Sequence, residues 1–509
     1  MNAMPTPSPA RDDREATLTE RLSAYRTVRE QVERLVLPLA TSVDGVSFVF
    51  QASLYGLALR RGGYIVLGGD GPERLGQITD LSVASERAAA EGLAAVGTDV
   101  VIRMARGEGT LLDSDGNGFH DATVRPALPH EVVEWLARAR PGRAALPVGE
   151  LLRAPGVAAV LDSGGLDRHT FMCGQSGSGK TYALGLLLER VLAETALPVV
   201  VLDPNSDYVR LASLRDGADP ELADRFARVV DDITVWGDGP TADQPLRLRF
   251  SDLDPEAQAA VLGLDPIADL DEYAVLRDLL REQEHDRPLV TGFEQLLQAE
   301  TPGARSLGVR ARNLGVLDWG LWSRKQRSIV DEICGSTARC TVVDLGSLGT
   351  PQEQRLVAQA VLSALWQTRA TRRPRLIVVD EAHNVCPAQP GDAVSALSTE
   401  TAIQIAAEGR KFGLYLLTST QRPHKVHKNV VSQCDNLFLM RMNSHDDLAE
   451  LSGIFSFVPE GLMAGATTFA MGEALVAGKI LRRPAYVRMG ERVTQEGGAD
   501  IPPTWADPR

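Results

Sequence analysis

The chain has 509 residues, of which 44% are apolar and 24% are charged, a composition typical of a globular protein with two or three domains. Its formal net charge of -14 argues against a surface that coats nucleic acid non-specifically, so any contact with nucleic acid should be local. Five cysteines without a CxxC pair support neither a disulfide framework nor a zinc site. No apolar run approaches the roughly 18 residues of a membrane-spanning helix, so we expect a cytoplasmic protein with no membrane contact.

The first 40 residues are predicted to form a tail and one helix. Residues 1 to about 14 are rich in proline, serine and charge, which is typical of a disordered segment. From Leu18 to Leu35 apolar residues recur every three or four positions, which predicts an amphipathic helix that ends before Pro38. Packing of the apolar stripe on its own domain is favoured over docking of a partner.

Residues 41–147 change to short runs of β character. Gly-Gly and Asp-Gly turn signals divide these runs, which cover Ser47–Phe50, Tyr64–Leu67, Leu75–Thr79 and Val100–Arg103. This pattern predicts a small β-barrel domain.

Residues 148–493 follow a rhythm of strand, glycine loop, helix and strand, which predicts an α/β domain with a largely parallel sheet. Between about residues 205 and 339 helical periodicity replaces this rhythm, so we expect an α-helical insertion there. Residues 494–509 are rich in proline and glycine and predict an extended C-terminal arm. Such an arm either crosses to a neighbouring subunit or is a disordered tail.

The segment GQSGSGKT fits the phosphate-loop pattern GxxxxGK[ST] completely. It follows the apolar strand Thr170–Cys173 and precedes a leucine-rich helix over residues 182–192, which is the setting that such a loop requires. Its glycines let backbone N–H groups surround the phosphates of ATP, Lys180 bridges the outer phosphates, and the Thr181 hydroxyl is expected to hold Mg²⁺. The predicted ATP-binding residues are Gly174, Gln175, Ser176, Gly177, Ser178, Gly179, Lys180 and Thr181.

A second apolar strand, Leu376–Val379, ends in two carboxylates. Asp380 is placed to bind the water shell of Mg²⁺, and Glu381 is placed to orient the attacking water. Neighbouring side chains on a strand point to opposite sides, so two roles for two neighbours are physically sensible. Together with the phosphate loop, this pair predicts a RecA-like P-loop ATPase core.

Three further residues are candidates for the catalytic machinery. Gln421 follows the strand Leu414–Leu417 and is predicted to sense the γ-phosphate, although it could instead cap the next helix. Arg168 begins the phosphate-loop strand and faces away from its own nucleotide, so it could act only on an adjacent subunit, as an arginine finger. Arg410 is a second candidate for sensing phosphate charge, with a surface cation at a helix C-terminus as the alternative.

The letters of Asp380 to His383 spell the DEAH that names a group of RNA helicases. Those enzymes carry two tandem RecA-like domains, and little more than 120 residues follow Glu381 here. Because there is no room for the second domain, the DEAH spelling does not identify the protein.

The ordered motifs GQSGSGKT, VVVLDPNSDY, VVDEAHNVCP, EGRKFG and TSTQRP resemble those of the HerA group of the HerA–FtsK ATPases. The resemblance spans residues 42–490 and includes a β-barrel ahead of the motor domain. By this resemblance Asp203 matches an acid near the nucleotide, Arg168 a trans-acting arginine, and Arg410 the arginine of the RKFG segment. The loop from Asn205 to Asp207 departs from the family pattern, so the resemblance assigns it no role.

The resemblance also implies a function. Family members form homohexameric rings that enclose double-stranded DNA in the pore and convert ATP hydrolysis into translocation or strand separation. They work with a partner nuclease in DNA-end processing and repair, and others pair with a nuclease or sirtuin-like effector in antiviral defence. A ring that scaffolds and activates such an effector without processive translocation is the alternative. A conjugative or FtsK-type pump is a weaker third interpretation, because no membrane segment is predicted.

Overall fold

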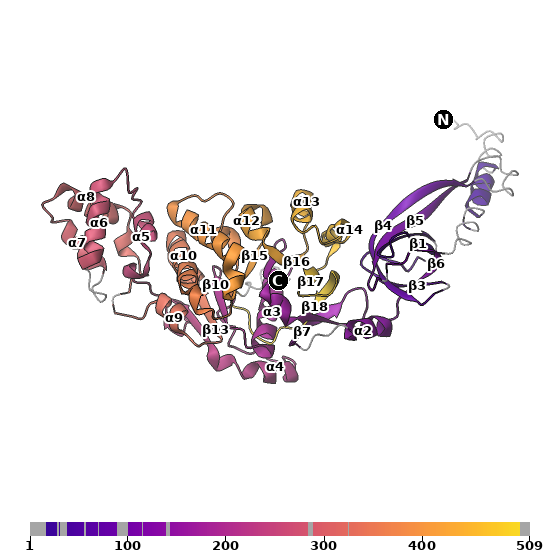
Figure 1. The fold of residues 1–509 in the computed structure, drawn as a ribbon, viewed down its shortest axis with the longest axis horizontal. Helices are drawn as coiled ribbons and strands as arrows, with labels where there is room; N and C mark the ends of the chain where they lie inside the picture. The colour runs from indigo at the N-terminus through magenta and orange to yellow at the C-terminus, as the bar shows by residue number, and fades with distance from the viewer. Residues whose placement is uncertain are drawn as a thin grey trace, which may run out of the picture. The chain divides into compact units, whose positions relative to one another are not determined.

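The computed structural model describes residues 17–27, 30, 38–54, 57–69, 71–88, 100–114, 116–138, 143–282, 289–323 and 325–498. These residues divide into two compact units, each drawn in Figure 1. The barrel unit comprises residues up to Arg138 with Arg153–Val157 and Pro459–Gly465, and the sheet unit comprises the remainder. The predicted tail over residues 1–14 lies outside the described residues. The helix predicted from Leu18 to Leu35 is present over 17–27 and at residue 30, and the rest of it is also outside them.

The predicted β-barrel is confirmed. Its strands close in the order β1-β2-β5-β4-β3-β6, with bounds β1 (Leu39–Ser42), β2 (Ser47–Ser53), β3 (Tyr64–Gly68), β4 (Arg74–Ala88), β5 (Val100–Leu111) and β6 (Phe119–Pro126). Alternate residues of β2 are buried, as expected for a strand with one face toward a core. The helix α2 (Pro129–Ala137) follows the last barrel strand.

Two glycines of β5 make room for aromatic side chains inside the barrel. Phe48 is paired with Gly109 and Phe50 with Gly107 across the β2–β5 ladder. A Cβ on Gly107 would lie 2.1 Å from the ring of Phe50, and one on Gly109 would lie 2.2 Å from that of Phe48. Both rings are at most 2% exposed, so this barrel is filled by side chains and leaves no space along these strands for larger residues.

The sheet unit is built on a twelve-stranded sheet in the order β12-β11-β13-β10-β14-β15-β9-β16-β17-β18-β7-β8. The strands from β12 to β16 are parallel, and those from β16 to β8 are antiparallel. The parallel strands are β9 (His169–Cys173), β10 (Val199–Asp203), β11 (Ile233–Gly237), β12 (Gln244–Pro245), β13 (Cys340–Asp344), β14 (Arg375–Val379), β15 (Leu414–Thr420) and β16 (Cys434–Met440). The predicted α/β class is confirmed, and the continuous apolar runs of β10 and β14 are buried on both faces, as in other parallel sheets.

The antiparallel strands and the principal helices complete the unit. The strands are β7 (Ala145–Leu151), β8 (Ala158–Asp162), β17 (Glu473–Gly478) and β18 (Ala485–Met489). The helices outside the predicted insertion are α3 (Lys180–Glu194), α10 (Pro351–Gln367), α11 (Ala393–Glu408), α12 (Lys428–Val431) and α13 (His445–Ile454), while α14 (Glu460–Ala464) belongs to the barrel unit. The predicted domain boundary at residues 147 and 148 falls inside β7, which pairs with β18 and β8 in the sheet unit.

The predicted helical insertion over residues 205–339 is not helical throughout. It holds α4 (Pro220–Ala227), α5 (Pro255–Val261), α6 (Leu270–Glu282), α7 (Leu289–Leu296), α8 (Pro302–Asn313) and α9 (Ile329–Gly335). It also holds β11, which lies beside β13 in the parallel sheet. The sequence ITVWG is rich in residues that favour strands, but the run has only five residues and lies among segments of helical periodicity, which outweighed it in the prediction.

The first residues of the predicted C-terminal arm pack on their own sheet unit. Thr494 is 1% exposed and forms a bridge with Leu214. The carboxylate of Glu189 in α3 accepts hydrogen bonds from the backbone N–H of Thr494 at 2.8 Å and of Val493 at 2.9 Å. The arm beyond residue 498 lies outside the described residues.

Candidate nucleotide site

The phosphate loop lies between the end of β9 and the start of α3. Gly177 and Gly179 have φ angles of 72° and 87°, a conformation that glycine adopts without steric cost. The loop is held from β16, because Gln175 N–H donates to the carbonyl of Arg441 and the Arg441 guanidinium donates to that of Gly177, both at 3.0 Å. The Ser178 hydroxyl is buried without a hydrogen-bond partner among the described residues. This backbone cradle at a helix N-terminus fits the phosphates of a nucleotide.

Lys180 is surrounded by the residues predicted to act with it. Its Nζ lies 2.7 Å from Oδ1 of Asp380 and 2.9 Å from the Ser419 hydroxyl. Oε1 of Glu381 lies 3.2 Å away. Burial acts to lower the pKa of Lys180, but the charges of the two carboxylates outweigh it and raise the pKa above its usual value. Lys180 therefore carries a full positive charge where the outer phosphates of ATP would lie.

Glu381 follows β14 in a left-handed turn with φ 43°. The Gln421 side-chain amide donates to its Oε1 at 3.0 Å, and Nδ1 of His383 lies 3.2 Å from its Oε2. Burial alone would raise the pKa of Glu381, but His383 and the positive charge of Lys180 lower it to about 2. Glu381 is thus ionised at neutral pH and can accept a hydrogen bond from an attacking water.

Asp203 organises the loop beside these groups. Its carboxylate accepts the backbone N–H of Asp207 at 3.0 Å and of Tyr208 at 2.8 Å, and the Tyr208 hydroxyl donates to Oδ2 of Asp380 at 3.2 Å. Ser206 takes the left-handed conformation and donates to Asp344 at 2.6 Å. Residues 205–207, which depart from the family pattern, therefore form a tight turn. This turn connects the ends of β10 and β13 to Asp380.

The buried acids of this loop favour a positive charge nearby. Burial raises the pKa of Asp207 to about 6, and the negative charge of Asp380 adds to this rise. Burial raises the pKa of Asp203 to about 8. A hard cation would relieve the repulsion between these acids, and oxygen ligands are those that Mg²⁺ prefers. Asp380 and the Thr181 hydroxyl are the residues that would hold Mg²⁺, which would neutralise charge on the phosphates when bound.

Arg168 and Arg410 are not brought to this site. They lie together at the other end of β9 and share Asp435, whose Oδ2 is 3.4 Å from Nε of Arg168 and 3.0 Å from Arg410. Both line a surface cavity of about 300 Å³. β9 has five residues, so about 16 Å of strand separates Arg168 from the phosphate loop.

Three residues around the site were not among the predicted site residues, although Tyr208 belongs to one of the motifs that resemble the HerA group. Arg441 supports the phosphate loop, Ser419 contacts Lys180, and Tyr208 contacts Asp380. Ser419 and Arg441 stand at or directly after the ends of β15 and β16, the strands that flank β9. Ser419 and Arg441 become neighbours of the phosphate loop only through the strand order, so no local motif in the sequence marks them as site residues.

Three features meet at the carboxyl edge of the parallel sheet. They are the phosphate loop, the buried acid pair after β14, and a polar residue directly after the adjacent strand β15. In this arrangement Lys180 and the loop could bind the phosphates of a nucleotide, and Glu381 with Gln421 could position a water. The fold and the site define a P-loop ATPase.

Comparison with known proteins narrows this class. Residues 146–365 match the family described as helicase HerA, central domain. The DNA double-strand break repair helicase HerA of Pyrococcus furiosus is 23% identical over 430 residues, which cover 71% of this chain and 73% of the relative. The protein with the same name from Sulfolobus acidocaldarius is 22% identical, over 66% of this chain and 67% of the relative.

Two solved structures are similar at lower identity. VirB4 of Thermoanaerobacter pseudethanolicus is 15% identical with a TM-score of 0.48, over 69% of this chain and 97% of that protein. The bacterial conjugative coupling protein TrwB is 14% identical with a TM-score of 0.46, over 72% of this chain and 92% of that protein. Among the described residues, none of the helices has the length and apolar character needed to cross a bilayer.

Proposed function

We propose that this protein is an ATP-driven DNA motor that works as a homohexameric ring and moves along or separates double-stranded DNA. The proposal rests on the match of residues 146–365 to the HerA central-domain family and on relatives whose names describe DNA double-strand break repair helicases. The observation that carries it is the hydrolytic constellation of Lys180, which lies inside the matched residues, with Asp380, Glu381 and Gln421, which lie beyond them.

A ring accounts for the position of the two distant arginines. Arg168 and Arg410 are partly exposed, with 32% and 43% of their side chains accessible. They lie at the edge of the sheet away from their own phosphate loop, so a nucleotide held by an adjacent subunit is the target that they would serve. This arrangement supports a trans-acting arginine pair.

The barrel is the surface that we propose for an effector. It exposes apolar side chains on two strands and one turn: Val83 in β4 is 62% accessible, Val49 in β2 is 45% accessible, and Val43 in the turn between β1 and β2 is 94% accessible. Exposed apolar residues on a closed barrel have no packing role in its core, and protein-binding surfaces often contain such residues. We propose that a partner nuclease docks there for DNA-end processing, with a sirtuin-like effector as the second candidate.

The motor proposal is tested by measuring steady-state ATP hydrolysis with and without linear double-stranded DNA. We expect DNA to stimulate turnover at least several-fold, and we expect no turnover from Glu381→Gln under either condition. Turnover that is indifferent to DNA, together with an effector that stays active alongside Glu381→Gln, would overturn the motor and favour a ring that only scaffolds its partner.

A further inference from the structure

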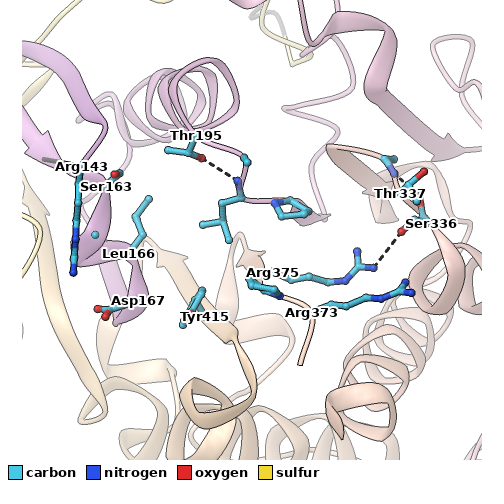
Figure 2. Close-up of a pocket in the computed structure, with 16 residues that line it drawn as sticks. Arg143, Ser163, Leu166, Asp167, Thr195, Ser336, Thr337, Arg373, Arg375 and Tyr415 are labelled. Carbon is cyan, nitrogen blue, oxygen red and sulfur yellow. Dashed lines mark hydrogen bonds between the residues drawn. The ribbon is translucent and has the colours of Figure 1, made fainter. Parts of the chain in front are cut away.

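A cavity of about 720 Å³ lies at the edge of the sheet where β9, β10, β13, β14 and β15 begin (Figure 2). The nucleotide site lies at the opposite edge, since Asp203 ends β10 and Asp380 follows β14. Arg375 starts β14 and lines the cavity. Because β14 has five residues, about 17 Å separates the cavity from Asp380. The cavity is therefore distinct from the nucleotide site.

Positively charged side chains line the cavity, although the protein as a whole is acidic. Arg143, Arg373 and Arg375 line it, with Arg143 on one side of the view in Figure 2 and the other two on the opposite side. Asp167 is the one carboxylate among the lining residues, and it lies 3.6 Å from Arg168. Within the described part of the chain, the three lining arginines form no ion pair. An excess of cationic groups around a hollow attracts an anion.

Arg375 is the most informative of the three arginines because it is only 7% exposed. Its guanidinium makes one long hydrogen bond, 3.4 Å from Nη2 to the Ser336 carbonyl. Burial, and then the charge of Arg373, lower its pKa. The charge of Glu332 opposes this fall, but no ion pair of Arg375 is formed among the described residues. A buried cation without an ion pair is costly, and an anion in the cavity would offset this cost with charge-assisted hydrogen bonds.

The rest of the lining is mainly apolar. Leu166, Leu197, Pro198 and Pro374 contribute carbon surface, and Tyr415 adds an aromatic ring. The volume lies within the range of about 300–1,000 Å³ that small-molecule sites occupy, and such sites combine an apolar lining with a few polar groups. A bare inorganic ion would leave this apolar surface unused.

We propose that the cavity binds a small organic anion with an apolar body, whose acidic group pairs with Arg375 and Arg373. This site is separate from the proposed motor function and does not depend on it. The guanidinium groups supply bidentate donors for a carboxylate, phosphate or sulfonate, and the leucine, proline and tyrosine side chains cover the apolar part of the ligand.

The test uses 1-anilinonaphthalene-8-sulfonate, an aromatic sulfonate whose fluorescence rises on binding, with the full-length protein. We expect saturable binding that Arg375→Gln weakens about tenfold and that Arg373→Gln weakens about threefold, because each variant removes a charged hydrogen-bond donor. Arg312→Gln, which replaces an exposed arginine of α8, is the matched control and should bind like the unaltered protein.

A replacement variant and two competition experiments complete the test. If Arg375→Gln fails to fold, as shown by its melting curve, the double variant Arg143→Gln with Arg373→Gln replaces it, since both side chains are exposed. Equal dye affinity in all variants would overturn the proposal. Displacement of the dye by Mg-ATP would place the dye in the nucleotide site, and displacement by a short DNA duplex would assign the cavity to nucleic acid; either result also overturns it.

Discussion

The side-chain amide of Gln421 donates a hydrogen bond to the Glu381 carboxylate at 3.0 Å, across the gap between β14 and β15. Glu381 is thereby held by the residue that directly follows β15, and it is ionised at neutral pH because His383 and Lys180 lower its pKa. A water placed between Gln421, Glu381 and a γ-phosphate would be oriented from two directions.

We first predict the effect of removing this base. Glu381→Gln should lower kcat about 10³-fold, because the amide cannot accept a proton or orient the water as a carboxylate does. Gln421→Ala should lower kcat by about 10-fold or more while leaving Glu381 ionised. Nucleotide affinity should stay within a few-fold in both. Gln367→Ala, on the exposed part of α10, serves as the control, and a normal kcat in Glu381→Gln would rule out this role.

Lys180 also has a structural role. Lys180→Ala should lower the free energy of unfolding by about 3 kcal/mol, because it leaves the buried carboxylates of Asp380 and Glu381 without their cation. Ser419→Ala removes one uncharged hydrogen-bond partner of Lys180 and should lower the free energy of unfolding by about 1 kcal/mol. Urea unfolding without nucleotide measures both. Equal losses in the two variants would show that the buried charges are compensated in another way.

The arginine pair leads to a mixing experiment. If the proposed ring is correct, Lys180→Ala and Arg168→Ala should each be inactive. The first variant would lack the lysine that holds its own nucleotide, and the second would lack the arginine that serves the nucleotide of an adjacent subunit. In a random one-to-one mixture about a quarter of the subunit interfaces join an intact phosphate loop to an intact Arg168. We expect ATP hydrolysis to reappear on mixing. A mixture as inactive as its components would argue that Arg168 acts within its own subunit or only supports Asp435.

His169 makes stability depend on pH. Its Nδ1 accepts the Leu416 backbone N–H at 2.9 Å, and burial followed by the nearby charge of Arg410 lowers its pKa from 6.5 to about 4. The unfolded chain therefore takes up the proton first, so the stability that neutral His169 contributes is complete above pH 6.5 and is lost as the pH falls toward 4.

Between pH 6.5 and 5 this loss should amount to about 2 kcal/mol. His169→Gln keeps an acceptor for Leu416 and should show a correspondingly smaller loss in urea unfolding. His445→Gln, at an exposed position, should behave like the unaltered protein. The same acid sensitivity in His169→Gln would exclude His169 as its source.

The ion pair of Glu189 and Arg492 should hold the C-terminal segment in place. Both side chains are fully buried, and Glu189 also accepts the backbone N–H groups of Val493 and Thr494. Glu189→Ala should lower the free energy of unfolding by about 3 kcal/mol or more, because it leaves a buried guanidinium and two backbone N–H groups without their acceptor. Glu491→Ala, at an exposed neighbouring position, should be nearly neutral in thermal unfolding. If Glu189→Ala leaves the thermal stability unchanged, the C-terminal segment is held by its other contacts.

Much of the fold followed from local patterns. The barrel strands near Phe48, Ile65 and Ile78 were recognisable from β-type runs between turn signals, and the parallel sheet from apolar runs that alternate with helices. The strand β11 was missed although its residues favour strands, because a run of only five residues was outweighed by the helical periodicity on both sides of it. β1 and β6 were missed for a different reason, since their conformations depend on closing the barrel.

The sequence by itself determined the phosphate loop, Lys180, the acids Asp380 and Glu381, and the class of α/β domain, because strand ends and glycine turns are local properties. Only the tertiary structure decided which distant groups meet. Lys180 and Asp380 are 200 positions apart, and the contact of Arg441 with the phosphate loop depends on β16 lying beside β9. The burial of Arg375 was likewise invisible in the sequence, because burial and the absence of an ion pair in the described structure depend on how the strand starts assemble into one edge of the sheet.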